Sequence, residues 1–177
     1  MRYLFTFLAS LVLLASPTAA LAVPPDGIQD GLGVSTAGAA APYLDQLLDE
    51  INRRREQAGT PPLTYAPDDA NDAVGRYLAD LTPLMLAAHG CFHGSSPGWS
   101  YVAAVGFRAE PRGEVLACPS NDGYWTPDRI ADGWWSSPVH QRVLYGDPNA
   151  NAVACGTYGS QRGGATYQTI ACVTYRW

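Results

Sequence analysis

The 177-residue sequence contains no lysine, and its 11 basic residues, all arginines, are outnumbered by 16 acidic residues. The formal net charge is −5 at pH 7. Nucleic-acid binding needs clustered Lys or Arg, so this balance argues against a nucleic-acid partner. The only basic run, Arg53-Arg54-Arg55, lies on a predicted helix beside Glu50 and Glu56, and we interpret it as a solvent-exposed face. We attribute the absence of lysine to coding bias.

Several motifs of familiar catalytic and binding sites are also absent. The chain has no Walker-type phosphate loop, no dinucleotide-binding fingerprint, no calcium loop and no H-E-x-x-H zinc motif. None of its cysteines forms a CxxC pair, which argues against a zinc site built from thiolates. Serines lie near histidines, but Ser136 and Ser137 are better explained as helix-end residues before Pro138. Nucleophilic catalysis is therefore a weaker hypothesis.

The N-terminus is predicted to be a secretory signal peptide, residues 1–22. Arg2 supplies a positive charge, an apolar stretch too short to span a bilayer with ease follows, and Ala20-Leu21-Ala22 fits a cleavage site. We expect cleavage after Ala22, a secreted protein and no stable membrane span; the alternative is an uncleaved anchor. Residues 23–40, rich in Gly, Ala and Pro, are predicted to be a flexible lead-in, and residues 41–177 a single domain.

Four cysteines in an exported chain predict two disulfides, for which three pairings are possible. Cys155 and Cys172 flank a predicted hairpin and can face each other across its two strands. That pairing leaves Cys91 with Cys118. The second bond would tie the segment after a helix to the segment just after Glu114.

Apolar spacing predicts two helices in the first part of the domain. One begins at Pro42 and stops at Gly59. The other begins near Asp68, where acidic residues suit the helix dipole, and runs toward Ala88 with a kink or restart at Pro83.

The second part of the domain is predicted to combine a helix and a sheet. The helix begins at Pro127 and ends before Pro138. Residues 110–122 are irregular or strand-like, and residues 151–158 and 166–177 form two strands joined by a Gly-rich turn. Helices on both flanks of a small antiparallel sheet make an α+β fold, a three-layer α-β-α sandwich.

The chain has only three histidines, and two of them accompany a glutamate beside Gly or Pro turns: His93, Glu114 and His140. Two neutral imidazoles and a carboxylate can hold a divalent ion, most readily zinc, with a position left for water. The structural alternative is a buried ion pair in which Glu114 and a histidine clamp helix ends to a loop. His89 is expected at a helix end against carbonyl groups and is the reserve ligand.

Three segments around these residues resemble the CAP superfamily of cysteine-rich secretory, antigen 5 and pathogenesis-related 1 proteins, in its bacterial branch. They are Cys91-Phe92-His93-Gly94, Arg112-Gly113-Glu114-Val115 and Trp134-Trp135-Ser136-Ser137-Pro138-Val139-His140. In that family a helix ends near a His, a Gly-Glu-Asn turn follows, and a Trp-x-x-Ser-Pro-x-His motif closes a second helix. The resemblance runs from about Tyr43 to Trp177. Val115 replaces the usual Asn, and Ser137 replaces a second Glu found in many eukaryotic relatives.

The resemblance implies the same sandwich, with zinc held by His93 and His140 in a surface cleft and Glu114 as the neighbouring acid. Because members of the superfamily have been linked to sterols, other lipids and proteins, it also implies a small apolar ligand or an extracellular protein as partner. We expect an extracellular binding module. One alternative is a zinc-dependent extracellular hydrolase with Glu114 as general base; the other is a disulfide-stapled structural module with an inert cleft.

Overall fold

The computed structural model describes residues 37–121 and 126–177. The predicted signal peptide and most of the predicted lead-in, up to residue 36, lie outside the described residues. The elements in chain order are α1 (Ala37–Gln57), β1 (Thr64–Tyr65), α2 (Asp68–Ala88), α3 (Gly98–Ala104), β2 (Glu110–Ser120), α4 (Pro127–Ser136), α5 (Pro138–Leu144), β3 (Ala152–Arg162) and β4 (Ala165–Arg176).

The four strands form one sheet in the order β1-β3-β4-β2. β4 pairs antiparallel with both β3 and β2, and the tight β3–β4 turn contains Gly163 and Gly164, both with positive φ. β1 pairs parallel with β3, through Thr64 opposite Ala152. The three predicted strands therefore pair antiparallel, and β1, which was not predicted as a strand, adds a parallel edge to the sheet. A two-residue strand between helices carries too weak a pattern for its direction to be predicted.

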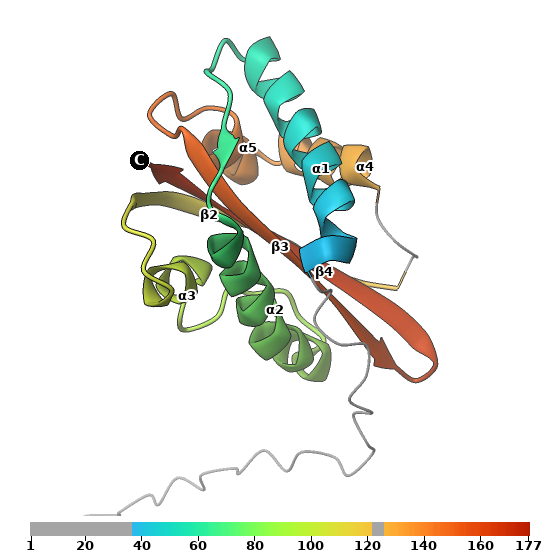
Figure 1. Ribbon diagram of the computed structural model, residues 1–177. Coiled ribbons are helices and arrows are strands. Elements are labelled where there is room, and N and C mark those ends of the chain that lie inside the picture. The colour runs from blue at the N-terminus through green and yellow to red at the C-terminus, as the bar shows by residue number, and fades with distance from the viewer. Residues whose placement is uncertain (1–36, 122–125) are drawn as a thin grey trace, which may run out of the picture.

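Two helical layers enclose the sheet, which confirms the predicted α-β-α sandwich (Figure 1). One hydrophobic core lies between the sheet and α1, α4 and α5, and the other between the sheet and α2 and α3. Alternation along β2 serves both cores, because Val115 packs in the first and Leu116 in the second. This alternation fixes the direction in which Glu114 points.

α1 extends beyond the proline that was predicted to begin it, whereas α2 runs to Ala88 as predicted. α1 begins at Ala37 and contains Pro42, so the end of the predicted lead-in belongs to the helix. α2 continues through Pro83 to Ala88. A proline removes one backbone donor, but burial of Leu81 and Met85 on either side of Pro83 holds the helix in place.

The basic run on α1 is not the exposed face that its charge predicted. Arg53 is exposed and pairs with Glu50, but Arg54 and Arg55 are only 2% and 0% exposed. Both continue the buried helical face of Leu47 and Ile51 at a spacing of three to four residues. Their side chains are thus committed to the protein interior, and they are not available to contact a phosphate backbone.

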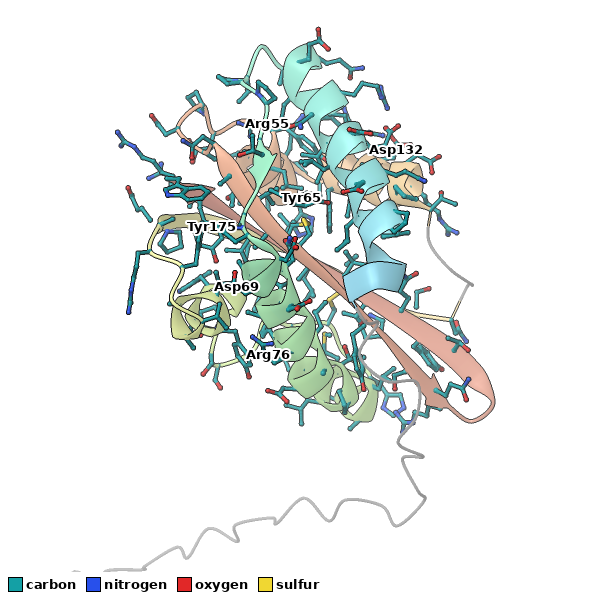
Figure 2. The ribbon with its side chains drawn as sticks, viewed as in Figure 1. Arg55, Tyr65, Asp69, Arg76, Asp132 and Tyr175 are labelled. Carbon is teal, nitrogen blue, oxygen red and sulfur yellow. A yellow bond between two sulfur atoms is a disulfide. The ribbon has the colours of Figure 1, made fainter. Side chains whose placement is uncertain are left out.

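The buried arginines bond to groups on other elements. Arg54 forms ion pairs with Glu50 and with Asp132 of α4. Arg55 donates to the backbone carbonyls of Pro61, Leu144, Asp147 and Ala150. Arg55 and Asp132 lie on the α1 side of the sheet and Tyr175 on the α2 side (Figure 2). The two arginines therefore fasten α1 to α4 and α5 of the same helical layer.

The four cysteines form two disulfides, as their number predicts. Cys155 and Cys172 are opposite each other on β3 and β4, fully buried, with Cα atoms 4.1 Å apart. Cys91 and Cys118, with Cα atoms 5.6 Å apart, connect the loop after α2 to β2 near the solvent.

Among the described residues, no helix is sufficiently long and apolar to traverse a bilayer.

Candidate functional site

Glu114 is a buried carboxylate on β2, the edge strand of the sheet. Its side chain is 2% exposed. Because side chains alternate along a strand, Glu114 points to the same face as Leu116, toward α2 and α3. The opposite face, which Val115 occupies, belongs to the hydrophobic core between the sheet and α1, α4 and α5. Val115, the departure from the family's Asn, therefore lies on the other side of the strand from the Glu114 side chain.

Three donors converge on the Glu114 carboxylate. Oε1 accepts from the Tyr77 hydroxyl at 2.8 Å and lies 2.6 Å from Nδ1 of His93. Oε2 accepts from the backbone N–H of Gly98 at 2.5 Å. A buried carboxylate needs such bonds to offset the loss of hydration. The donors come from α2, from the loop after it and from the start of α3, so Glu114 joins all three segments.

The His93–Glu114 contact determines how the imidazole is presented. An ionised carboxylate only accepts hydrogen bonds, so Nδ1 of His93 is the protonated nitrogen. When the ring is neutral, its other nitrogen, Nε2, carries the free lone pair. The His93 side chain is 51% exposed, in contrast to its buried partner. The pair thus offers an oriented imidazole at the protein surface.

A glycine makes the close approach of α3 possible. A Cβ atom at Gly98 would lie 2.8 Å from Oε2 of Glu114 and 3.1 Å from a methyl carbon of Val173. Any larger residue at position 98 would force the carboxylate or the start of α3 to shift. Tyr77 also accepts from the N–H of Gly94 at 3.3 Å, and burial, followed by its bond to Glu114, raises the pKa of its hydroxyl. Tyr77 therefore remains a neutral donor.

His140 approaches the same edge of the sheet from the opposite helical layer. It lies on α5, which packs closely on β2: a Cβ at Gly113 would be 2.7 Å from Val143. His140 is half-buried, and its pKa is lowered by burial and then by the charge of His93. The two histidines are therefore near enough to influence each other. A lowered pKa keeps the His140 imidazole neutral at pH 7.

The three predicted residues do not form a complete metal cluster. Within residues 37–121 and 126–177, no group of three or more His, Cys, Asp and Glu side chains is placed to hold a metal ion. Glu114 is buried and occupied by three donors, which suits it to orient His93 rather than to bind a metal directly. Two imidazoles and a carboxylate are donor types that divalent ions accept.

The third histidine lies apart from this arrangement. His89 follows α2 at its C-terminal end with φ of 48°, and its backbone N–H donates to the carbonyl of Leu86 at 3.4 Å. This position agrees with the helix-end interpretation. No contact connects His89 to Glu114 among the described interactions.

Sequence reasoning missed two contributors, Tyr77 and Gly98. Tyr77 appears in the sequence only as one member of the apolar stripe of α2, and Gly98 only as one of several loop glycines. Residues 94–98 also spell G-x-S-x-G around Ser96. A nucleophile elbow needs a strand before the serine and a helix after it, whereas Ser96 lies in the loop between the helices α2 and α3. The match is therefore coincidental.

Comparisons with known proteins agree with this architecture. The model of the cysteine-rich secretory protein family, CAP, matches residues 48–175. Among solved structures, an outer surface protein from Borrelia burgdorferi is similar, with a TM-score of 0.54 and 14% sequence identity. The match covers 78% of this chain and 96% of that chain. At this identity the likeness concerns the fold alone. No curated protein matches the chain.

Proposed function

Because the chain belongs to the cysteine-rich secretory protein (CAP) family, we propose that it is an extracellular binding module that holds a divalent metal ion, zinc foremost, through His93 and His140. The observation that carries the proposal is the 2.6 Å contact between Nδ1 of His93 and Oε1 of Glu114. In metal sites a carboxylate in this position fixes the imidazole ring and increases the basicity of the other nitrogen. Glu114 has that role here.

The electrostatics of His140 support the same role. A histidine must be neutral to donate a lone pair to a metal, and burial lowers the pKa of His140. His93 and His140 would be the two protein ligands. Bound zinc would supply a Lewis acid at this edge of the sheet.

A location outside the cytoplasm is supported by the covalent structure. Both disulfides persist only in an oxidising compartment, and all four cysteines are used in them. The predicted signal peptide would deliver the chain there.

Exposed apolar side chains support an apolar component in the partner. Phe92, Trp99 and Val139 are among the exposed large hydrophobic residues. Each adjoins a residue of the site in sequence: His93, Gly98 and His140 respectively. A small apolar ligand or an extracellular protein with apolar side chains would fit this composition.

Hydrolysis has less support than binding. A general base must reach a water or a substrate proton, and the Glu114 side chain is 2% exposed with three donors already attached. We therefore assign Glu114 as a positioning residue. The inert-clamp alternative predicts the same contacts but no metal affinity.

Zinc titration of the oxidised domain by calorimetry tests the proposal. We expect saturable one-to-one binding that is abolished in His93→Ala and in His140→Ala. His89→Gly is the matched control, because it removes the third imidazole at a positive φ that glycine tolerates. Absence of binding by the wild-type protein, or binding that survives both substitutions, would leave Glu114 and the histidines as a structural clamp.

A further inference from the structure

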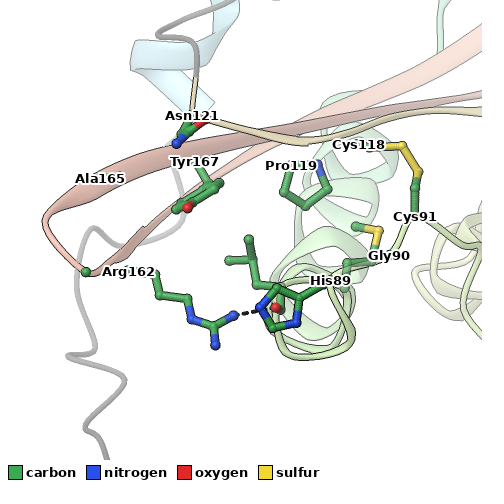
Figure 3. A pocket seen from close by; sticks show the side chains of 12 residues that line it. His89, Gly90, Cys91, Cys118, Pro119, Asn121, Arg162, Ala165 and Tyr167 are labelled. Carbon is green, nitrogen blue, oxygen red and sulfur yellow. Dashed lines mark hydrogen bonds between the residues drawn. A yellow bond between two sulfur atoms is a disulfide. The ribbon is translucent and has the colours of Figure 1, made fainter.

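A pocket whose lining includes neither His93 nor Glu114 lies between the C-terminal end of α2 and the β3–β4 turn. Its volume is about 770 Å³, within the range of small-molecule pockets in proteins. The Cys91–Cys118 disulfide forms part of its wall, and Arg162 and His89 lie together at one end (Figure 3). Nothing in the proposed metal function uses this space.

The charge of this pocket is opposite to that of the whole chain. Within residues 37–121 and 126–177, its lining includes the guanidinium of Arg162 and the imidazole of His89 and contains no Asp or Glu. The chain as a whole has 16 acidic and 11 basic residues. An acid-free pocket with an arginine is therefore unrepresentative of the surface, and it favours an anionic ligand.

Arg162 partly offsets the negative charge at the C-terminal end of α2. Two of the last four carbonyls of the helix have donors: Arg162 donates to the carbonyl of Leu86, and the N–H of Gly90 donates to that of Met85 at 3.1 Å. One Nη group of Arg162 makes that bond, and a guanidinium carries five N–H donors. The remaining donors of Arg162 can serve a ligand.

The rest of the lining is suited to an apolar body. Met85, Leu86, Pro119 and Tyr167 contribute to the wall, and Tyr167 comes from the same β3–β4 hairpin as Arg162 (Figure 3). An aromatic ring offers a flat surface on which another ring can stack. The pocket thus combines a cationic end with an apolar wall.

We propose that this pocket binds a small amphipathic anion, an aryl carboxylate or aryl sulfonate, whose oxyanion pairs with Arg162 and His89 and whose ring packs against Tyr167 and Met85. Bidentate pairing of a guanidinium with an oxyanion supplies both affinity and orientation. The site is separate from the metal site and does not depend on it.

Two fluorescent probes that differ only by one sulfonate group test this inference on the oxidised protein. 8-Anilinonaphthalene-1-sulfonate has the anion, and N-phenyl-1-naphthylamine has the same rings without it. We expect saturable one-to-one binding of the sulfonate and at least about tenfold weaker binding of the neutral probe. Equal affinities would overturn the proposal, because binding would then be non-specific apolar adsorption.

Substitutions locate the binding. Arg162→Gln should lower the affinity for the sulfonate by about tenfold and leave the affinity for the neutral probe unchanged. Arg176→Gln is the matched control, an exposed arginine on the same hairpin outside the pocket. Circular dichroism would confirm that the variant is folded. If Arg162→Gln then leaves the sulfonate affinity unchanged, the proposed anion site is wrong. Zinc affinity of Arg162→Gln should equal that of the wild type, which separates this test from that of the metal site.

Discussion

His93 and Glu114 are 21 residues apart in sequence, yet Nδ1 of the exposed imidazole lies 2.6 Å from Oε1 of the buried carboxylate. The contact unites the loop after α2 with the edge strand β2. It turns a surface histidine into one with a fixed ring and a defined free nitrogen. The same contact also satisfies a carboxylate that the core would otherwise isolate. Its effects on metal affinity and on stability can be separated experimentally.

Glu114→Gln should reduce zinc affinity by about tenfold to a hundredfold, because the neutral amide orients His93 less well and no longer increases its basicity. It should also lower the free energy of unfolding by about 1–3 kcal/mol, since the amide cannot accept from all three donors. Calorimetry and urea denaturation measure the two effects. Glu56→Gln, an exposed change on α1, is the control. If Glu114→Gln lowers stability but leaves zinc affinity unchanged, the result would favour the alternative in which Glu114 and the histidines form only a structural clamp.

Gly98→Ala should destabilise the protein by about 1–3 kcal/mol, because the added Cβ overlaps Oε2 of Glu114 and must push α3 away from the carboxylate. The matched control is Gly133→Ala in α4, where a Cβ meets nothing within 4 Å. There we expect stabilisation of roughly 0.5–1 kcal/mol from helix propensity. Urea denaturation compares the two variants. Equal effects would show that the close approach at Gly98 is unimportant.

Arg55→Met should lower the free energy of unfolding by about 3 kcal/mol or more. It leaves buried carbonyls at Leu144 and Ala150 without their donor, each a loss of about 1–3 kcal/mol. Arg53→Met, on the exposed side of the same run, should change stability by less than about 0.5 kcal/mol. Urea denaturation decides. A small effect at residue 55 would mean that water replaces the guanidinium.

The pH dependence of stability should show the lowered pKa of His140. In the unfolded chain this residue takes up a proton near its ordinary pKa of 6.5, whereas in the folded protein burial delays protonation to lower pH. The unfolded state therefore binds more protons as the pH falls below about 6.5, and stability decreases there. Urea denaturation between pH 8 and pH 5 should show a smaller decrease for His140→Gln. Identical profiles would contradict this assignment.

The two disulfides should differ in their accessibility to a reducing agent. Dithiothreitol should reduce Cys91–Cys118 first, because Cys91 is exposed whereas Cys155 and Cys172 are fully buried. Alkylation followed by peptide mass spectrometry gives the order. Losing the first bond removes a cross-link over 27 residues, with an expected loss of about 3 kcal/mol of stability. Earlier reduction of Cys155–Cys172 would contradict the burial argument.

Part of the site was accessible to sequence reasoning. Helical spacing predicted α1, α2 and α4, and the register of two strands placed Cys155 opposite Cys172. The approximate positions of His93 and Glu114 followed from turn residues and motif order. These features depend on local periodicity and on residues within one hairpin. Both can be recognised in the amino-acid sequence without knowledge of the tertiary structure.

The sequence by itself determined which residues are available for chemistry: two disulfides, a surface histidine after a helix and a glutamate on a strand. Only the tertiary structure decided that Arg54 and Arg55 are buried, that Tyr77 and Gly98 donate to Glu114, and that His140 arrives from the opposite helical layer. The parallel direction of β1 and the pocket lined by Arg162 and His89 were likewise decided only by the tertiary structure. The physical reason is that each of these features joins segments far apart in the chain. Their packing is set by how two helical layers fit one sheet, and no local pattern encodes that fit.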